Sequence, residues 1–357
     1  MEESSFVERK ALLIDSFGRT LDYLRVSVTD RCNLRCVYCM PPGGVPWKPH
    51  ETMLSFEEIL RLCRIMAELG IRYVKVTGGE PLVRRGVAAF LKNLKALPGI
   101  ERLTLTTNGF LLDTYLDEAE APSLSPDARP GFPLDGVNIS LDALDSERFG
   151  RISRHEGSGP AEILALIDRL LEKKVQVKLN CVPVRSFNEE EILPLAALAK
   201  DKNIAVRFIE LMPLGSAAAL EPVPGPEVAS LLEKAYGALT PFNSIQGSRT
   251  EGSGPAVYYS LPGFAGKIGF INALSHGFCE SCNRLRLTSE GLLKPCLSDE
   301  LSLDMRKFLR NGASDMELEK AITGIVAKKP RFHTFSAVYG AAEIKGRHPN
   351  GMSGIGG

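Results

Sequence analysis

Strand-like and helix-like segments alternate along the first two thirds of the chain, and this alternation restricts the fold more than any other feature. Short apolar runs recur six times, at spacings of roughly 30 to 50 residues. The runs are Leu24–Val28, Tyr73–Thr77, Leu103–Thr107, Gly136–Leu141, Val175–Cys181 and Ala205–Leu211. Helical periodicity appears between successive runs, as in Ser55–Leu69, Arg84–Leu97, Ala161–Lys173 and Glu189–Lys200. The pattern predicts an α/β fold in which right-handed crossover helices join parallel strands.

Six such units are too few for a closed eight-stranded barrel, but they suffice for a partial one. An open doubly wound sheet would give much the same pattern, and the periodicity does not separate the two. In either architecture, binding and catalytic groups gather at the carboxyl ends of the strands. The first strand runs into a cysteine-rich loop, and the second runs into a Gly-Gly-Glu-Pro turn at 78–81. We therefore expect the functional site at this edge of the sheet.

The composition excludes several classes of protein. Lys plus Arg and Asp plus Glu both number 43, which gives no electrostatic case for a nucleic-acid or membrane surface. The sequence has no run of about 18 apolar residues that would predict a transmembrane helix. Its charged N-terminal segment lacks the apolar core of a secretory signal. We therefore expect a cytoplasmic protein whose cysteines serve as metal ligands rather than as disulfides.

The expected domain organisation follows from length and from Pro- and Gly-rich segments. At 357 residues the chain is long enough for one large α/β domain and a smaller one. A stretch rich in Pro and Gly at 213–226 marks the expected boundary after the sixth strand. We expect domains at 13–226 and 227–344, followed by a glycine-rich tail at 345–357. A segment rich in Pro, Ser and Asp at 119–133 is expected to be a surface loop.

Three cysteines spaced C-x3-C-x2-C follow the first strand, at Cys32, Cys36 and Cys39. Three thiolates can hold only three of the four irons of a cubane cluster, so one iron stays open to bind another molecule. The spacing would also place the three side chains on one face of a buried helix. However, the Pro-Pro-Gly-Gly run that begins at Pro41 cannot continue a helix, which favours the metal-binding interpretation.

Two isolated cysteines, Cys63 and Cys181, are predicted to be core residues. Cys63 lies on the apolar stripe of the predicted helix Ser55–Leu69, which begins with a capping box formed by Ser55 and Glu58. Cys181 ends a strand-like run. Neither position suggests a metal ligand.

A second group, Cys279, Cys282 and Cys296, has the spacing C-x2-C-x13-C. Alone, this spacing is typical of structural zinc with His276 as the fourth ligand. With the first group in the same chain, a second cubane cluster is the favoured interpretation. An Arg-Leu-Arg run at 284–286 lies between these cysteines, and alternate residues of an extended segment project to the same side. Such a pair of guanidinium groups suits phosphate oxygens.

The first cysteine group, with the aromatic Tyr38 just before its last cysteine, resembles the radical S-adenosylmethionine superfamily. The Gly-Gly-Glu-Pro turn resembles that superfamily's clamp for the amino group of S-adenosylmethionine. The resemblance implies a partial (βα)6 barrel with a smaller C-terminal α+β domain that closes the barrel mouth. It also implies a [4Fe-4S] cluster on Cys32, Cys36 and Cys39, whose open iron binds S-adenosylmethionine. An unidentified low-potential electron donor would reduce this cluster, and a 5′-deoxyadenosyl radical would form.

The second group with its two arginines, together with the terminal Gly356 and Gly357, resembles the GTP 3′,8-cyclase family of molybdenum cofactor biosynthesis. This resemblance covers nearly the whole chain. It implies that GTP is the substrate and that (8S)-3′,8-cyclo-7,8-dihydroguanosine 5′-triphosphate is the product. Cys279, Cys282 and Cys296 are then implied ligands of a second [4Fe-4S] cluster, whose open iron contacts the guanine.

The family resemblance also implies a role for individual residues. The implied contacts to S-adenosylmethionine are Tyr38, Gly79, Ser140 and Met212. The implied contacts to GTP are Arg25, Lys75, Thr106, Lys178, Arg284, Leu285 and Arg286. Gly356 and Gly357 are implied to act in catalysis. The family usually has arginine where this chain has Lys75, and lysine keeps the charge but lacks the bidentate fork.

Two rival interpretations remain open at this stage. One is a radical enzyme that modifies peptides with an auxiliary cluster, although such enzymes usually carry more C-terminal cysteines. The other is a zinc-stabilised interaction module, which would bind one zinc ion instead of iron and sulfide. The sequence does not indicate the oligomeric state, and a homodimer remains one of the options.

The tail generates the first testable prediction. Deleting Gly356 and Gly357 should leave folding, cluster content and GTP affinity nearly intact, yet abolish 3′,8-cyclisation. The physical reason is access, because only residues without Cβ can thread into a filled cavity. GTP titration and product assay of the same truncated preparation provide the measurement. Turnover equal to that of the full-length chain would show that the tail has no catalytic role.

Overall fold

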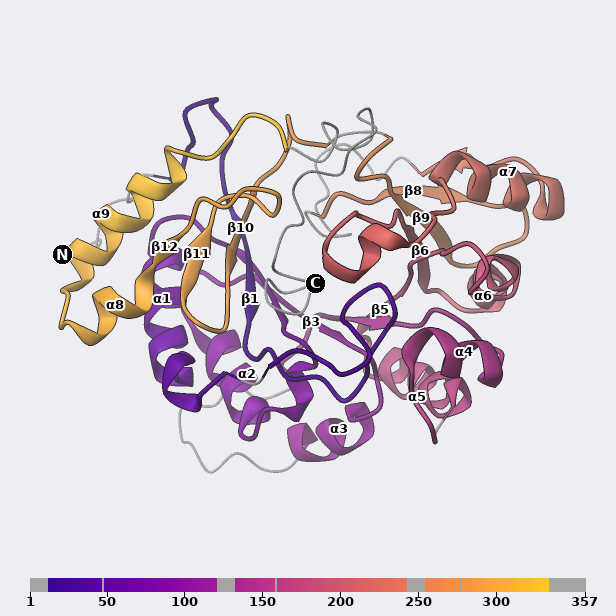
Figure 1. The fold of residues 1–357 in the computed structure, drawn as a ribbon, viewed down its shortest axis with the longest axis horizontal. Helices are drawn as coiled ribbons and strands as arrows, with labels where there is room; N and C mark the ends of the chain where they lie inside the picture. The colour runs from indigo at the N-terminus through magenta and orange to yellow at the C-terminus, as the bar shows by residue number, and fades with distance from the viewer. Residues whose placement is uncertain are drawn as a thin grey trace, which may run out of the picture.

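The structure is a computed structural model, and it describes residues 12–46, 48–120, 132–157, 159–242, 254–275 and 278–333. The strands of these residues form one twelve-stranded sheet. Figure 1 shows helices along the outer side of the curved sheet, with the strands on the inner side. The predicted tail, including Gly356 and Gly357, lies outside the described residues.

Six neighbouring strands are parallel and follow one another in chain order. They are β1 (Tyr23–Ser27), β2 (Tyr73–Thr77), β3 (Arg102–Thr107), β4 (Gly136–Ser140), β5 (Gln176–Cys181) and β6 (Ala205–Ile209). The predicted α/β fold with parallel strands is confirmed. The strand ends differ from the predicted ones by no more than two residues.

The helices that connect and cover these strands include those predicted from periodicity. They are α1 (Phe56–Glu68), α2 (Val87–Ala96), α3 (Leu112–Glu120), α4 (Ser146–Ser153), α5 (Pro160–Glu172), α6 (Ile192–Asp201), α7 (Gly225–Tyr236), α8 (Met305–Arg310) and α9 (Asp315–Val326). Helix α2 begins later than predicted because Gly86, just before it, adopts a left-handed conformation with φ of 80°. No helix among the described residues is long and apolar enough to cross a membrane.

Three further predictions concern the start of α1, two isolated cysteines and one loop. Helix α1 begins with the predicted capping box, in which Ser55 and Glu58 bond each other's backbone N–H groups. Cys63 and Cys181 are buried, as predicted for core residues. The predicted loop 119–133 begins later than expected, because Ala119 belongs to α3 and is buried. Most of that segment, residues 121–131, lies outside the described residues.

The parallel strands present apolar side chains to the helices and polar ones to the interior. On β1, Leu24 and Val26 are fully buried, and Arg25 between them faces the opposite side. In the sheet register Arg25 is the partner of Lys75 on β2 and of Arg286 on a C-terminal strand. A slip of one residue would turn these basic side chains into the hydrophobic core, so the burial pattern fixes the register.

Strands from the C-terminal third extend both edges of the six-stranded sheet. At one edge β10 (Arg284–Leu287) pairs in parallel with β1, followed by the antiparallel β11 (Leu292–Lys294) and β12 (Leu303–Asp304). At the other edge β9 (Lys267–Ile271) pairs in parallel with β6, followed by the antiparallel β8 (Val257–Ser260) and β7 (Thr240–Pro241). The segment that carries the second cysteine group therefore adjoins the strand that precedes the first.

Candidate functional site

A cavity of about 300 Å³ on the inner side of the sheet is lined by both cysteine groups. Most of the residues implied by the family resemblance line it. They are Arg25, Cys32, Cys36, Tyr38, Cys39, Lys75, Gly79, Thr106, Ser140, Met212, Cys279, Cys282, Arg284, Arg286 and Cys296. Leu285 is an exception, because its side chain is fully buried in the hydrophobic core. Any contact of Leu285 with a ligand in this cavity would therefore come from its backbone.

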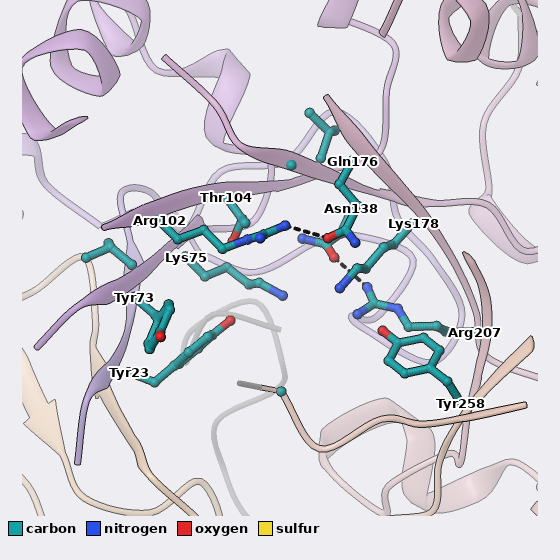
Figure 2. Close-up of a pocket in the computed structure, with 14 residues that line it drawn as sticks. Tyr23, Tyr73, Lys75, Arg102, Thr104, Asn138, Gln176, Lys178, Arg207 and Tyr258 are labelled. Atoms are coloured by element: carbon teal, nitrogen blue, oxygen red, sulfur yellow. Dashed lines mark hydrogen bonds between the residues drawn. The ribbon is translucent and has the colours of Figure 1, made fainter. Parts of the chain in front are cut away.

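Lys178 lies in an adjoining pocket rather than in the cavity itself. The pocket and the cavity share Tyr23, Lys75 and Arg207. Figure 2 shows the side chains of Lys75 and Lys178 directed toward the space beside Arg207. Nη2 of Arg207 donates a hydrogen bond to Oδ1 of Asn138 at 2.6 Å, which fixes the guanidinium between the two spaces. The two spaces therefore meet at basic side chains.

The two cysteine groups lie at opposite ends of β1. The first group follows the carboxyl end of β1, whereas Cys282 precedes the amino end of β10. Because β1 and β10 are parallel, Cys282 lies near the amino end of β1. Five residues of strand at about 3.3 Å each give a separation of roughly 16 Å. The first cysteine loop and the Gly-Gly turn therefore lie at the carboxyl ends of β1 and β2, as expected, whereas the second group lies beside the amino end of β1.

The first cysteine group lies in a loop that is docked on α4. The backbone N–H groups of Arg35 and Val37 donate to the carbonyl oxygens of Ser153 and Ile152, at 3.0 and 2.9 Å. Within the loop, the N–H of Cys39 donates to the carbonyl oxygen of Cys36 at 2.9 Å. These bonds fix the backbone of a loop whose three thiols form no disulfide and line the cavity.

The Gly-Gly turn after β2 is shaped by the backbone of the cysteine loop. The N–H of Gly79 donates to the carbonyl oxygen of Thr29 at 2.8 Å. A Cβ on Gly79 would lie 2.4 Å from the carbonyl oxygen of Arg31, and one on Gly78 would lie 2.7 Å from that of Thr29. Glycine is therefore required at both positions by the chain's own backbone, and both residues also line the cavity.

Glu80, which follows the two glycines of the turn, is buried, with 1% of its surface exposed. One oxygen accepts from the Thr107 hydroxyl and the Leu82 N–H, and the other accepts from the Asn108 N–H at 2.7 Å. Burial raises the pKa of Glu80 to about 7, although the three hydrogen bonds lower it. Glu80 therefore ties the end of β2 to the end of β3.

Tyr38 is held by a residue that the sequence did not single out. Its hydroxyl donates to Oδ2 of Asp142 at 2.6 Å, and Oδ1 of Asp142 accepts from the N–H of Val182 at 2.8 Å. Burial raises the pKa of Asp142 to about 6, although both hydrogen bonds lower it. The ends of β4 and β5 thus fix the aromatic ring beside the first cysteine group.

The second cysteine group is surrounded by cations. Arg284 approaches the Cys282 sulfur to 3.5 Å through Nη2. Burial alone would raise the pKa of Cys282, but Arg284 and Lys329 lower it to about 6. The backbone N–H of His333 donates to the Cys279 sulfur at 3.3 Å. These contacts favour the thiolate, which is the form that ligates metals.

No group of three or more His, Cys, Asp or Glu side chains among the described residues is arranged to hold a single metal ion. The three cysteine ligands of a cubane each bind a different iron, so their sulfurs need not converge on one point. His276, the fourth ligand in the zinc interpretation, lies outside the described residues.

Basic side chains outnumber acidic ones around the cavity. The basic residues that line it are Arg25, Lys75, Arg207, Arg284, Arg286 and Lys329, and the acidic ones are Asp142 and Glu210. Both carboxylates are engaged, because Asp142 binds Tyr38 and Glu210 accepts from the N–H of Leu274 at 2.8 Å.

The same excess of positive charge acts on the pKa values of the interior lysines. Burial lowers the pKa of Lys75, and Arg207 and Arg25 lower it further. Burial with Arg207 and Arg102 lowers the pKa of Lys178 to about 6. A ligand with several negative charges would relieve this repulsion and restore the ordinary charge of both lysines.

Several site residues were missed by the sequence argument. Arg207, Asp142 and Lys329 line the cavity, and Asn138 and Arg102 line the adjoining pocket. Arg207 gave a usable signal, because it is a charged residue at an inward position of an otherwise apolar strand. The other four residues have no comparable sequence signal, because only the folded chain brings them next to the cavity or its adjoining pocket.

Comparison with known families matches two parts of the chain. The Radical SAM superfamily matches residues 26–199, and the family described as Molybdenum Cofactor Synthesis C matches residues 204–335. Among solved structures, the chain is similar to Streptococcus suis SuiB bound to S-adenosylmethionine, with a TM-score of 0.55 and 14% identity. That similarity covers 93% of this chain and 76% of SuiB, and it concerns the fold alone.

Curated relatives carry a more specific name. The GTP 3′,8-cyclase of Clostridium perfringens strain 13 is 41% identical over 90% of this chain and 94% of its own length. The GTP 3′,8-cyclase of Moorella thermoacetica is 42% identical over 96% of this chain and 99% of its own. That of Heliobacterium modesticaldum is 43% identical over 97% of this chain and 100% of its own.

The contact between the glycine turn and the cysteine loop generates a prediction. Gly79→Ala should force Arg31 and the cysteine loop to move, which should lower the free energy of unfolding by about 1–3 kcal/mol. It should also reduce the iron that the first cysteine group retains. Gly324→Ala in α9 is the matched control, because a Cβ there meets no atom within 4 Å. The control should be stabilised by about 0.5–1 kcal/mol.

Urea unfolding and iron analysis of both variants provide the measurement. If Gly79→Ala matches the wild-type chain in unfolding free energy and iron, the turn does not support the cysteine loop.

Proposed function

The chain belongs to the GTP 3′,8-cyclase family of radical S-adenosylmethionine enzymes, and we propose that its cavity converts GTP to (8S)-3′,8-cyclo-7,8-dihydroguanosine 5′-triphosphate. This reaction is the first step of molybdenum cofactor biosynthesis. One observation carries the proposal: a single cavity contains both cysteine groups, at opposite ends of β1, with an excess of basic side chains between them.

The first cysteine group is proposed to hold the cluster that binds S-adenosylmethionine. The donor set fits, because Cys32, Cys36 and Cys39 form no disulfide and line one cavity. When bound, the cluster and S-adenosylmethionine supply a hydrogen-abstracting 5′-deoxyadenosyl radical. The chain's own part is to orient this cofactor and to exclude water.

The proposed contacts to S-adenosylmethionine surround the first group. Tyr38 is fixed by Asp142, and Gly79 is fixed by the cysteine loop, so two of the contacts are preorganised. Ser140 ends β4, and Met212 follows β6, so these two line the cavity from strands farther along the sheet.

The second cysteine group is proposed to hold a second [4Fe-4S] cluster near the guanine. Support comes from the thiols of Cys279, Cys282 and Cys296, which form no disulfide, and from Arg284 and Lys329, which lower the pKa of Cys282. Together with the first group, it would give two clusters per chain. A zinc ion in the second group is the alternative, and metal analysis separates the two.

GTP is proposed to lie between the groups. Arg25, Arg284 and Arg286 come from the adjacent strands β1 and β10, with Arg25 and Arg286 in register. Lys75 and Thr106 follow on β2 and β3, and Lys178 contributes from the adjoining pocket. Guanidinium and ammonium groups suit the phosphate oxygens. Leu285 would contribute through its backbone.

The chemistry proposed for GTP balances in three changes. The ribose C3′ hydrogen leaves and 5′-deoxyadenosine forms, a bond then forms between C3′ and C8 of guanine, and the resulting nitrogen-centred radical takes up one electron and one proton. The electrons come from a low-potential donor. No side-chain nucleophile is required.

The domain boundaries remain proposals. The six parallel strands of residues 13–226 are proposed to form a partial (βα)6 barrel. Residues 227–344 are proposed to form the α+β part that closes its mouth, and 345–357 to form the glycine-ended tail. The extension of both sheet edges by C-terminal strands supports this arrangement.

The test is anaerobic incubation of the iron-loaded protein with GTP, S-adenosylmethionine and dithionite, followed by mass analysis of both products. Cys32→Ala should form no 5′-deoxyadenosine, even without GTP, because the cluster with the open iron is lost. Cys63→Ala is the control, because Cys63 lies on α1, is buried in the hydrophobic core and forms no disulfide. This variant should still form both products. Cleavage of S-adenosylmethionine by Cys32→Ala would refute the role of the first group.

The phosphate contacts generate a separate prediction for Arg286→Ala. Loss of a charge-assisted bond to phosphate costs about 1.5–3 kcal/mol, so GTP affinity should fall by roughly tenfold or more. Iron content should stay unchanged. Arg284 is left intact in this test because it contacts Cys282.

Equilibrium binding of GTP measures the effect. Arg185→Ala is the matched control, because Arg185 pairs with Glu227 at the surface at 2.9 Å and should not affect binding. Equal GTP affinity in Arg286→Ala and the wild-type chain would contradict the proposed phosphate contact.

A further inference from the structure

Lys329, which follows α9, is a buried lysine in unusual surroundings. The residue is 3% exposed, and its ammonium donates to the backbone carbonyl oxygen of Arg284 at 2.8 Å and to that of Pro295. Among the described residues no carboxylate forms an ion pair with it. Burying an ammonium without an anion is costly, so its counter-charge must come from another group.

The nearby groups that act on this charge are sulfurs and other cations. Burial lowers the pKa of Lys329, whereas Cys282 and Cys296 raise it, and Arg19 and Arg284 lower it. The two cysteines are the anionic partners that the site offers, once they are thiolates. Three thiolates around a [4Fe-4S]2+ core carry one net negative charge, which an adjacent ammonium balances.

The two carbonyls that Lys329 binds belong to the two arms of the second cysteine group. Pro295 directly precedes Cys296, and Arg284 is two residues after Cys282. The ammonium of Lys329 therefore joins the backbone beside Cys282 to the backbone beside Cys296, although Lys329 itself lies in a different segment, after α9.

Arg19 acts on the third cysteine of the group in a similar way. Its Nη1 donates to the carbonyl oxygen of Cys279 at 2.7 Å, and its Nη2 donates to that of Pro330, the residue after Lys329. Hydrogen bonds of Lys329 and Arg19 thus link the segment that follows α9 to the backbone at or beside each of the three cysteines. A neutral hydrogen-bond donor would be enough to hold these backbone segments together. The buried positive charge of Lys329 therefore needs a further explanation.

We propose that Lys329 is a positioning residue of the second cysteine group and that its ammonium balances the negative charge of a cluster held there. This inference rests on the proposed second cluster. It predicts that Lys329 makes that cluster easier to reduce, because a nearby positive charge stabilises the more negative, reduced state. The first group lies at the other end of β1 and should not respond.

The test compares full-length Lys329→Met and Lys329→Gln, reconstituted anaerobically with iron and sulfide. Redox titration followed by electron paramagnetic resonance gives the midpoint potential of each cluster. The second cluster is measured in chains in which Cys32, Cys36 and Cys39 are changed to alanine. The first cluster is measured in chains in which Cys279, Cys282 and Cys296 are changed to alanine. Both Lys329 variants should shift the second cluster to a more negative midpoint and leave the first unchanged.

The two variants separate charge from bracing. Met removes the charge and both donated bonds, so it should also lower the iron retained by the second group. Gln keeps a donor, so it should retain more iron than Met while showing the same direction of shift. Lys95→Met is the matched control, because Lys95 also donates to a backbone carbonyl, that of Glu101 at 3.0 Å, on the outer side of the sheet. It should change neither cluster.

Failure of this inference and failure of the proposed function give different results. A wild-type chain with about eight irons, whose second cluster has the same potential and iron content in both Lys329 variants, would overturn the role of Lys329 alone. A wild-type chain with about four irons and one zinc would overturn the second cluster, and the role of Lys329 with it.

Discussion

The parallel pairing of β1 with β10 is the contact on which the site depends. It joins the strand that leads into the first cysteine loop to the strand that leaves the second cysteine group. The length of β1 then sets the distance between the two groups, and the register sets what lies between them. Arg25 and Arg286 face each other across this pair, so two guanidinium groups occupy the middle of the interval. An antiparallel pairing would have brought both cysteine groups to one end.

Two of the cations that line the cavity are bound by neutral acceptors, and these contacts do not neutralise their charge. Arg207 is bound by the amide oxygens of Asn138 and Asn180, and Lys329 is bound by backbone carbonyls. The most buried carboxylate near the site, Glu80, instead accepts three bonds that join two strands. This distribution weakens the empty protein, because like charges repel in a medium of low dielectric constant. The same repulsion becomes attraction when an anion with several charges enters.

The parts of this protein that could be predicted from sequence are those that local patterns determine. The strands and α1 follow from periodicity and capping, and the cysteines follow from spacing, because each signal lies within a few residues. The hydrogen bonds of Glu80 could not be predicted in this way, since its partners Thr107 and Asn108 lie at the end of β3, far from Glu80 in the sequence. The position of Lys329 depends on a tertiary contact that no local pattern encodes. The position of the second cysteine group beside the amino end of β1 could not be predicted either, because it depends on the pairing of β10 with β1.

The extension of both sheet edges by C-terminal strands also determines the order in which the molecule can be built during synthesis. The ribosome releases the chain from its N-terminus, so β1 and β6 emerge long before their partners β10 and β9. Until then each is an unpaired edge of an apolar sheet, the kind of surface that associates with other chains. Contacts between segments so distant in sequence also form slowly. The thiols of the first cysteine loop therefore emerge well before the wall that encloses them, and a nascent chain must be protected from aggregation and oxidation through that interval.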